Sequence, residues 1–261
     1  MGDGTLFNSP PLPLPHSPPL VLSSVGTRFP TPDCRLLNQL PALNRKLAPE
    51  QPTLKTQRLV LRPLTLDDAP TVERLAGEKD IASTTRLIPH PYPPGMAEHW
   101  IGSLPELYIR AEMINWGIAM DDGLLLGTIR LTLNPVDNHA EMGYWVGKPF
   151  WNNGYCTEAA RAVVGHGFDK LDLERIYANY MARNPASGRV LAKLGMVQEG
   201  LLRRHRRKFG RYEDLIVCGI TRSEWQLHKK QTAAAGREPS SPAPLPQQPE
   251  VNLPPEPRQT A

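Results

Sequence analysis

The stretch FWNNGYCTEAARA, residues 150–162, contains a polar turn whose composition suggests anion binding. Asn152, Asn153 and Gly154 separate a strand-like run, AEMGYWVG, from a helical run of small and apolar residues. The first N–H groups of a helix have no partner within the helix and lie at the positive end of its dipole, so a compact turn in front of them leaves them open to a ligand. An ordinary strand-to-helix turn without a ligand is compatible with the same residues.

A second helix start has the same character. NPASGRVLAKLG, residues 184–195, predicts a helix with Asn184 as N-cap, Pro185 in the first turn and Gly195 at the end. It follows the strand-like run RIYANYM, as the first turn follows AEMGYWVG. If these two strands are neighbours, both helix starts face one edge of the sheet, where a single ligand can reach both.

The chain lacks the signatures of the common nucleotide, hydrolase and metal sites. GxxxxGK[ST], GxGxxG after a strand, GxSxG and HExxH are all absent. Cys34, Cys156 and Cys218 are widely spaced, without CxxC and without histidine at metal-ligand spacing, which favours a reducing compartment and no metal. A diphosphate held by backbone amides therefore fits the polar turn better than a nucleoside triphosphate or a dinucleotide.

The most basic run is LLRRHRRKFGR, residues 201–211, in a chain whose formal net charge is only +4. The first interpretation is a strand whose exposed face carries charge, and the second is attraction for an acidic substrate or a cofactor phosphate. Nucleic-acid binding ranks third, because no aromatic residues alternate with the charges.

Proline divides the chain into one domain and two tails. Of the 29 prolines, 11 precede Thr53 and 8 follow Ala235. Proline-rich segments bury little apolar surface, so residues 1–53 and 231–261 are predicted to be disordered, and residues 54–230 to form the domain. The tails also offer docking sequences for SH3 or WW domains. No apolar run is long enough to span a bilayer, and we expect a cytoplasmic protein, with a nuclear or mitochondrial destination left open.

Hydrophobic periodicity predicts a mixed α/β domain. The turn signal DDG joins NWGIAM and LLLGTIRLTL in a hairpin, and FGR joins the last two strands. Thr65 and Asp68 form a predicted capping box, and MAEHWIGSLPELYIRA predicts a helix interrupted near Pro105. The predicted order is a strand, helices, three strands, a helix, a strand, a helix and two strands.

Several blocks in this order resemble the GNAT acetyltransferases, in particular the RimJ and RimL branch that acts on ribosomal-protein N-termini. They are TQRLVLRPLTLDDAP, RLIPHPYPP, AEMGYWVGKPFWNNGYCTEAARAVVGHGF and NPASGRVLAKLGMVQEGLLR. The resemblance implies a mixed, mostly antiparallel, seven-stranded sheet, splayed between two central strands and flanked by helices. It also implies that acetyl-CoA lies in the splay, with a primary amine as the acceptor and no metal.

The resemblance implies that the polar turn holds the CoA pyrophosphate through its backbone. Gly154 matches the family pattern, whereas Trp151 replaces the usual Gln or Arg, and Cys156 the usual Gly or Ala. A backbone N–H of Trp145 or Val146 contacts the acetyl oxygen. The implied CoA-binding residues are Trp145, Val146, Trp151, Asn152, Asn153, Gly154, Tyr155, Cys156, Thr157, Asn184 and Ser187.

The resemblance carries over one catalytic residue, Ser187, and a second candidate, Glu141, is inferred from its place before GYW near the splay. Ser187 corresponds to a serine that stabilises the leaving thiolate, because Leu191 stands where many members have a tyrosine. Another helix-start hydroxyl without a catalytic role is the alternative. Glu141 is the candidate general base. The alternatives are that Glu141 is only an exposed strand residue, or that a water chain takes the proton. The glutamate that some relatives use as base is replaced by Arg206.

The expected activity is acetyl transfer from acetyl-CoA to a protein N-terminal α-amine or a small-molecule amine. The resemblance implies direct attack rather than an acyl-enzyme, so Cys156 is not expected to be a nucleophile. The competing class is a weakly active or inactive CoA-binding scaffold with proline-rich docking tails. Trp151, Leu191 and Arg206 favour the scaffold, and Gly154, Asn184 and Ser187 favour the enzyme.

Overall fold

The computed structural model describes residues 47–235 of the 261-residue chain. The proline-rich runs before residue 47 and after residue 235 lie outside the described residues, and so do most of the predicted disorder and the proposed SH3 or WW docking sequences. Within the described part no helix is both long and apolar enough to cross a membrane.

The described residues form one sheet of eight strands in the order β1-β2-β3-β4-β5-β6-β8-β7. All neighbours pair antiparallel except β5 and β6, which confirms the predicted mixed, mostly antiparallel sheet. The strand beyond the seven expected is β1, which pairs with β2 over its two residues. The strands are β1 Leu54–Lys55, β2 Leu59–Arg62, β3 Met113–Met120, β4 Leu125–Asn134, β5 His139–Val146, β6 Arg175–Met181, β7 Val197–Lys208 and β8 Arg211–Thr221.

The helices begin where the sequence places caps and turn residues. The capping box of Thr65 and Asp68 is present, and Gly195 follows α6 with a left-handed φ of 80°. The helices are η2 Leu66–Asp68, α2 Ala69–Ala76, α3 Lys79–Thr84, α4 Met96–Ile109, η3 Lys148–Phe150, α5 Tyr155–Asp169, α6 Pro185–Lys193 and α7 Arg222–Ala235.

Helix α4 differs from the expectation, because it continues through Pro105 instead of being interrupted. Proline removes one backbone donor, which leaves the carbonyl of Ile101 without its helical partner. Pro105 itself is exposed, so α4 accommodates its ring on the side away from the core.

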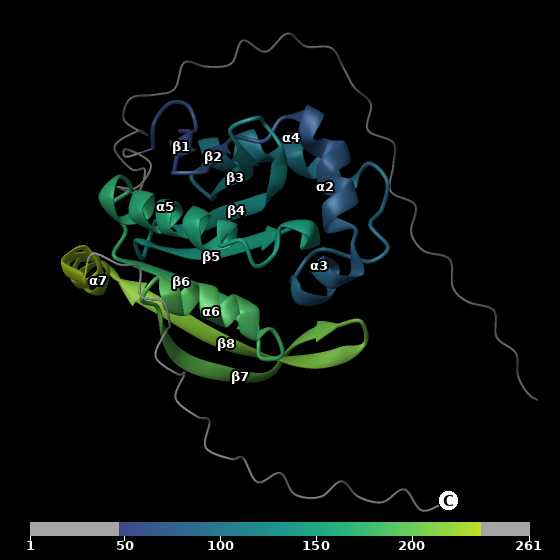
Figure 1. Cartoon of the computed structure of the whole chain (residues 1–261). Helices are drawn as coiled ribbons and strands as arrows, with labels where there is room; N and C mark the ends of the chain where they lie inside the picture. Colours follow the sequence, from purple (N-terminus) through teal and green to yellow (C-terminus); the bar gives the residue numbers. More distant parts are fainter. Residues whose placement is uncertain (1–46, 236–261) are drawn as a thin grey trace, which may run out of the picture. The chain divides into compact units, whose positions relative to one another are not determined.

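The sheet is splayed between β5 and β6. These strands pair in parallel only from His139 to Glu141 on β5 and from Arg175 to Tyr177 on β6. Beyond that point β5 continues to Val146 and β6 to Met181, and the two move apart toward α3 (Figure 1). The expected splay between two central strands is therefore confirmed.

Alternate residues of β4 and β5 belong to different hydrophobic clusters on the two faces of the sheet. Leu126 and Val146 join the main core, which includes residues of α5 and α6. Leu125 and Trp145 instead pack with residues of α2 and α4 in a second cluster. Side chains alternate between the two faces of a strand. The two clusters therefore assign each residue of β4 and β5 near the splay to one face of the sheet.

The packed domain includes residues that precede its expected start at residue 54. The Tyr108 hydroxyl donates to the carbonyls of Ala48 (2.8 Å) and Glu50 (3.1 Å). The Trp116 indole donates to the Pro52 carbonyl (2.8 Å), and the Gln51 amide donates to the Asn115 carbonyl (2.8 Å). Buried donors on α4 and β3 hold this segment, so its prolines do not prevent it from packing.

Candidate active site

A cavity of about 820 Å³ lies at the splay and is lined from β4, β5, β6, β7, α2 to α6 and the polar turn. Of the residues implied by the sequence, Asn153 is the one that does not line it. The others do: Glu141, Trp145, Val146, Trp151, Asn152, Gly154, Tyr155, Cys156, Thr157, Asn184 and Ser187. The fold therefore brings residues from distant segments to one enclosed space.

The polar turn has the backbone that an open helix start requires. Asn152 (φ 62°) and Gly154 (φ 79°) are both left-handed, and α5 begins directly after them. The Asn153 side chain does not face the cavity, because its amide donates to the carbonyls of Trp151 (2.9 Å) and Phe150 (3.3 Å). Asn153 therefore shapes the turn, and the first N–H groups of α5 are left without helical partners at the cavity.

Trp151 occupies the turn differently from the Gln or Arg it replaces. Its indole N–H donates to the carbonyl of Val146 (2.6 Å), so the ring folds back over the end of β5. The ring is 41% exposed. Trp151 thus fixes the strand end from which the turn departs and has no cationic group to offer a phosphate.

Arg58 supplies a cation at the turn that sequence reasoning missed. Its guanidinium donates to the Asn153 carbonyl (3.0 Å) and to Glu158 (2.7 Å), and lies 4.7 Å from the centre of the Tyr155 ring. Burial by itself raises the pKa of Glu158, but the hydrogen bonds from Thr56 and Arg58 and the charge of Arg58 lower it overall. Arg58 is 95 residues from Asn153, so no local pattern relates the two.

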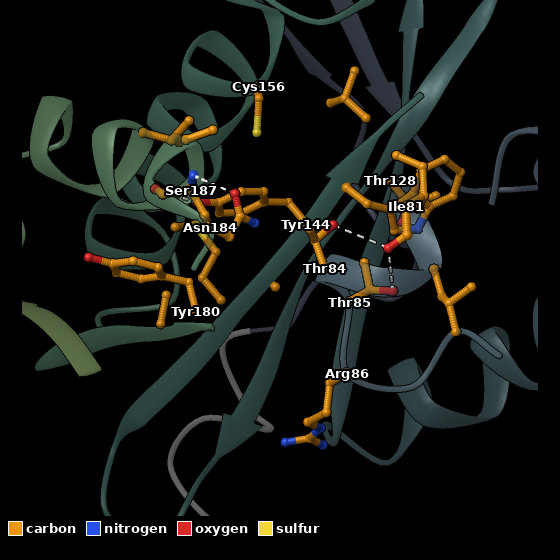
Figure 2. Close-up of a pocket in the computed structure, with 18 of the residues that line it drawn as sticks. Ile81, Thr84, Thr85, Arg86, Thr128, Tyr144, Cys156, Tyr180, Asn184 and Ser187 are labelled. Atoms are coloured by element: carbon orange, nitrogen blue, oxygen red, sulfur yellow. Dashed lines mark hydrogen bonds between the residues drawn. The ribbon is translucent and has the colours of Figure 1, made fainter. Parts of the chain in front are cut away.

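Tyr144 is a second residue that sequence reasoning missed. It extends from β5 toward the start of α6, where its hydroxyl lies 2.8 Å from Ser187 Oγ and donates to the Ser187 carbonyl at 3.1 Å (Figure 2). Burial raises the pKa of Tyr144 well above its ordinary value, so the phenol keeps its proton at neutral pH. The signal in the sequence is the polar hydroxyl within GYW, at the end of a strand that leads into the site.

Asn184 and Leu191 of the α6 region have different environments. The Asn184 side chain accepts a hydrogen bond from the Ser187 N–H (3.4 Å), as expected of an N-cap. Leu191 is only 1% exposed and belongs to the main core. The position that carries tyrosine in many GNAT members therefore lies in packed apolar surroundings in this protein.

Glu141 occupies the opposite face of the sheet from Tyr144. Its cross-strand partner is Thr132, while Arg130 faces Gly143 two residues further along β5. The Glu141 carboxylate accepts a long hydrogen bond from the Asn179 amide (3.4 Å) and lies 3.8 Å from Arg86. The cavity thus has two sides, with Tyr144 and Ser187 on one and Glu141 on the other, and Figure 2 shows Arg86 well apart from Ser187.

Neither a reactive thiol nor a metal cluster is present in the described part of the site. Burial raises the pKa of Cys156 to about 12, so its sulfur stays protonated at neutral pH. Residues 47–235 contain no group of three or more His, Cys, Asp or Glu side chains placed to hold a metal ion.

Comparisons with known proteins agree with this geometry. A family profile described as "Acetyltransferase (GNAT) domain" matches residues 58–197, more than half of the chain. The chain is 33% identical over 182 residues to the uncharacterized N-acetyltransferase YoaA of Bacillus subtilis, covering 66% of this chain and 97% of that protein.

Two further similarities involve RimJ and a ribosomal-protein N-acetyltransferase. The chain is 31% identical over 84 residues to the ribosomal protein uS5-alanine N-acetyltransferase of Escherichia coli, which covers 32% of this chain and 43% of that enzyme. The solved structure of Mycobacterium smegmatis RimJ in complex with CoA-disulfide superposes with a TM-score of 0.63 at 25% identity. That match covers 72% of this chain and 96% of RimJ.

Proposed function

This chain belongs to the GNAT acetyltransferase family, and from that premise we propose that it transfers acetyl from acetyl-CoA to a primary amine, on a protein N-terminus or a small molecule. The observation that carries the proposal is the splay itself. The starts of α5 and α6 line the same cavity as the free ends of β5 and β6. A thioester and an amine that enter from opposite faces of the sheet meet there and react directly.

The turn and the first turn of α5 suit the pyrophosphate of CoA. Left-handed Asn152 and Gly154 keep side chains away from the N–H groups of Tyr155, Cys156 and Thr157. A Cβ on Gly154 would lie 3.4 Å from the Arg58 guanidinium, so that charge stands directly beside the turn. Arg58 therefore places a guanidinium beside the turn where Trp151 has none, and its charge is balanced there by Glu158 (2.7 Å).

The register of β5 favours Val146 over Trp145 as the donor to the acetyl oxygen. The Gly147 N–H donates to the Leu126 carbonyl of β4 (2.8 Å). Because alternate residues of an antiparallel strand point their N–H groups to the same side, Trp145 also faces β4, and Val146 faces the splay. An N–H at that position stabilises the negative charge that develops on the thioester oxygen.

Ser187 and Tyr144 form a hydroxyl pair for the departing thiolate. The first turn of α6 places Ser187 near the positive end of the helix, and the protonated Tyr144 phenol lies 2.8 Å away. The Tyr144 hydroxyl also donates to the Ser187 carbonyl, which fixes Ser187 relative to β5. Such a pair can hydrogen-bond or protonate the sulfur as the carbon–sulfur bond breaks.

The amine nitrogen reaches the thioester from the Glu141 side of the cavity. Glu141 accepts the amine proton directly or through a water, and the acetyl carbon then forms its new bond to nitrogen as the bond to sulfur breaks. Cys156 takes no part, because its protonated thiol is a poor nucleophile. Transfer therefore occurs within one ternary complex.

The test is binding followed by turnover. Acetyl-CoA should raise the melting temperature of the full chain, and a panel of peptides and small amines should release free CoA thiol in its presence. Stabilisation without thiol release from any amine would instead favour a CoA-binding scaffold. Absence of both effects would contradict both the acetyltransferase and the CoA-binding scaffold.

A further inference from the structure

The side of the cavity that carries Glu141 contains an excess of arginine. Arg130, Gly143, Glu141 and Asn179 share one face of the sheet, as their cross-strand pairings on β4, β5 and β6 require. Arg206 of β7 and Arg86, which follows α3, line the same cavity. Glu141 is the one carboxylate among the described cavity-lining residues, so three guanidinium groups face a single negative charge on this side.

Two of these arginines have a buried Nε without a hydrogen-bond partner among the described residues. Nε of Arg130 and Nε of Arg206 are buried atoms without hydrogen bonds within residues 47–235, and neither side chain pairs with a carboxylate there within 4.0 Å. Burial lowers the pKa of Arg130, and the attraction of Glu141 only partly opposes that effect. Buried guanidinium nitrogens without acceptors are costly, which points to a ligand that supplies acceptors.

The position of Arg130 depends on the residue opposite to it. A Cβ added to Gly143 would lie 3.0 Å from Arg130 Cζ, so the absence of a side chain lets the guanidinium lie flat across β5. Lys208, two residues beyond Arg206 on β7, is a further buried cation. Lys208 is 8% exposed and donates to the Ile88 carbonyl (2.6 Å), and burial and the charge of Arg183 lower its pKa.

The nearby carboxylate of Glu213 does not neutralise the positive charge of this region, because it is paired with Arg183. The Arg183 guanidinium pairs with Glu213 (2.9 Å), which is the cross-strand partner of Arg206. The charges of Arg183 and Glu213 therefore cancel each other. The carboxylate of Glu213 is not left to balance the charge of Arg206. The positive excess of the Glu141 side remains.

The CoA phosphates do not account for the unpartnered arginines. The polar turn and the start of α5 belong to the side of the cavity that carries Tyr144, whereas Arg130 projects from the opposite face. Gly143, beside Arg130, also lies three residues before Val146, or roughly 10 Å along β5. The guanidinium groups are thus placed to meet the acceptor and not the donor.

We propose that the acceptor is an acidic amine, in which a carboxylate binds Arg130 and Arg206 while the amine nitrogen lies at the splay. This inference rests on the proposed acetyltransferase activity and names the substrate class of that site. Arginine suits a carboxylate because its planar donors match the two oxygens. The separation of roughly 10 Å along β5 fits an acidic side chain within the first residues of a peptide, and a free amino dicarboxylic acid is the smaller compound with the same chemistry.

Matched acceptors test the proposal on the full chain. One arm uses C-terminally amidated peptides that differ only by Asp or Asn, or Glu or Gln, in their first three residues. The other arm compares free aspartate and glutamate with their diamides. We expect kcat/KM to favour the acid over its amide by roughly tenfold or more in at least one arm. The arm that shows the preference identifies the source of the carboxylate.

The variants Arg130→Gln and Arg206→Gln should remove most of that preference. They should leave stabilisation by acetyl-CoA near the wild-type value, which also shows that the variants fold. Arg110→Gln is the matched control, because Arg110 lies at the end of α4 and pairs there with Glu106. Equal use of acid and amide, or a preference that survives in both arginine variants, would overturn the proposal.

A binding measurement separates this proposal from the activity on which it rests. With CoA present, the acidic peptide or amino acid should raise the melting temperature more than its amide, and Arg130→Gln should abolish the difference. If this difference appears but no thiol is released, the acidic site stands and the acetyltransferase proposal fails. If thiol is released from neutral amines and the acid shows no advantage in binding or turnover, the acidic site fails alone.

Discussion

Tyr144 and Ser187 illustrate how single residues on separate elements become one chemical unit. Ser187 has a hydroxyl at a helix start, which by itself is as typical of a cap as of a catalyst. The contact with the protonated Tyr144, whose hydroxyl donates to the Ser187 carbonyl, fixes the geometry of the Ser187 hydroxyl. We therefore expect the pair to act jointly on the leaving thiolate.

Replacement of Ser187 by alanine should lower kcat about tenfold or more, with little change in the KM for acetyl-CoA, because the lost hydroxyl acts on the departing sulfur. Tyr144→Phe should also lower kcat, and the double variant should lose little more than the more impaired single variant. Steady-state thiol release measures all three variants.

Ser103→Ala is the control for these variants, because Ser103 donates only to the Trp100 carbonyl on α4 (2.7 Å) and lies outside the cavity lining. It should retain wild-type kcat. Strictly additive losses in the double variant would show that Tyr144 and Ser187 act independently.

At the scale of elements, the start of α5 is the feature that suits the donor. The turn holds two left-handed positions, Asn152 and Gly154. Between them, the Asn153 side chain donates to carbonyls of the same turn. Trp151 and Arg58 then anchor the turn to β5 and to the start of β2. In the proposed function, binding of the pyrophosphate is therefore a property of the whole junction and not of one side chain.

Gly154→Ala should weaken acetyl-CoA binding several-fold. A non-glycine residue in the left-handed region costs about 1–2 kcal/mol, and relaxation of this strain would turn the N–H groups of α5 away from the phosphate. The measurement is calorimetric titration of the variant with acetyl-CoA.

Gly123→Ala provides a strain-matched control. Gly123 has a φ of 89° in the β3–β4 turn, with no atom within 4 Å of an added Cβ, and it does not line the cavity. Both variants should lose similar stability, while only Gly154→Ala loses affinity. Equal affinity in the two variants would contradict a role of the α5 start in binding.

At the scale of the whole molecule, the described domain begins before its first strand. Residues 48–52 accept or donate four hydrogen bonds that involve Tyr108, Trp116 and Asn115. Trp116 is fully buried and Tyr108 is only 6% exposed, so their polar groups depend on this segment. The core of α4 and β3 is incomplete without it.

Deletion of residues 1–53 should therefore destabilise the protein relative to deletion of residues 1–46. Each buried donor left without a partner costs about 1–3 kcal/mol, so the shorter chain should lose about 2 kcal/mol or more in its free energy of unfolding. Urea denaturation of the two truncated chains measures the difference, and the longer one serves as the control. Identical midpoints would mean that residues 47–53 contribute nothing to stability.

Local sequence patterns determined the elements and the general character of the site. Alternation and turn signals are local, so the hairpins, the capping box of Thr65 and Asp68 and the start of α6 at Asn184 could be predicted. The order of several blocks, together with Gly154, was enough to identify the family. Pro105 shows the limit of such patterns, because α4 continues through a residue that usually interrupts a helix.

Only the tertiary structure decided which residues from distant segments share the cavity. Arg58 meets Asn153 across 95 residues, Tyr144 meets Ser187 across 43, and Arg130 reaches the acceptor side because its strand partner is Gly143. Strand register sets these pairings, and register depends on the packing of the whole sheet. The sequence by itself thus determined the family and its splayed sheet, and the fold decided that Tyr144 meets Ser187 and that Arg130 lies across Gly143.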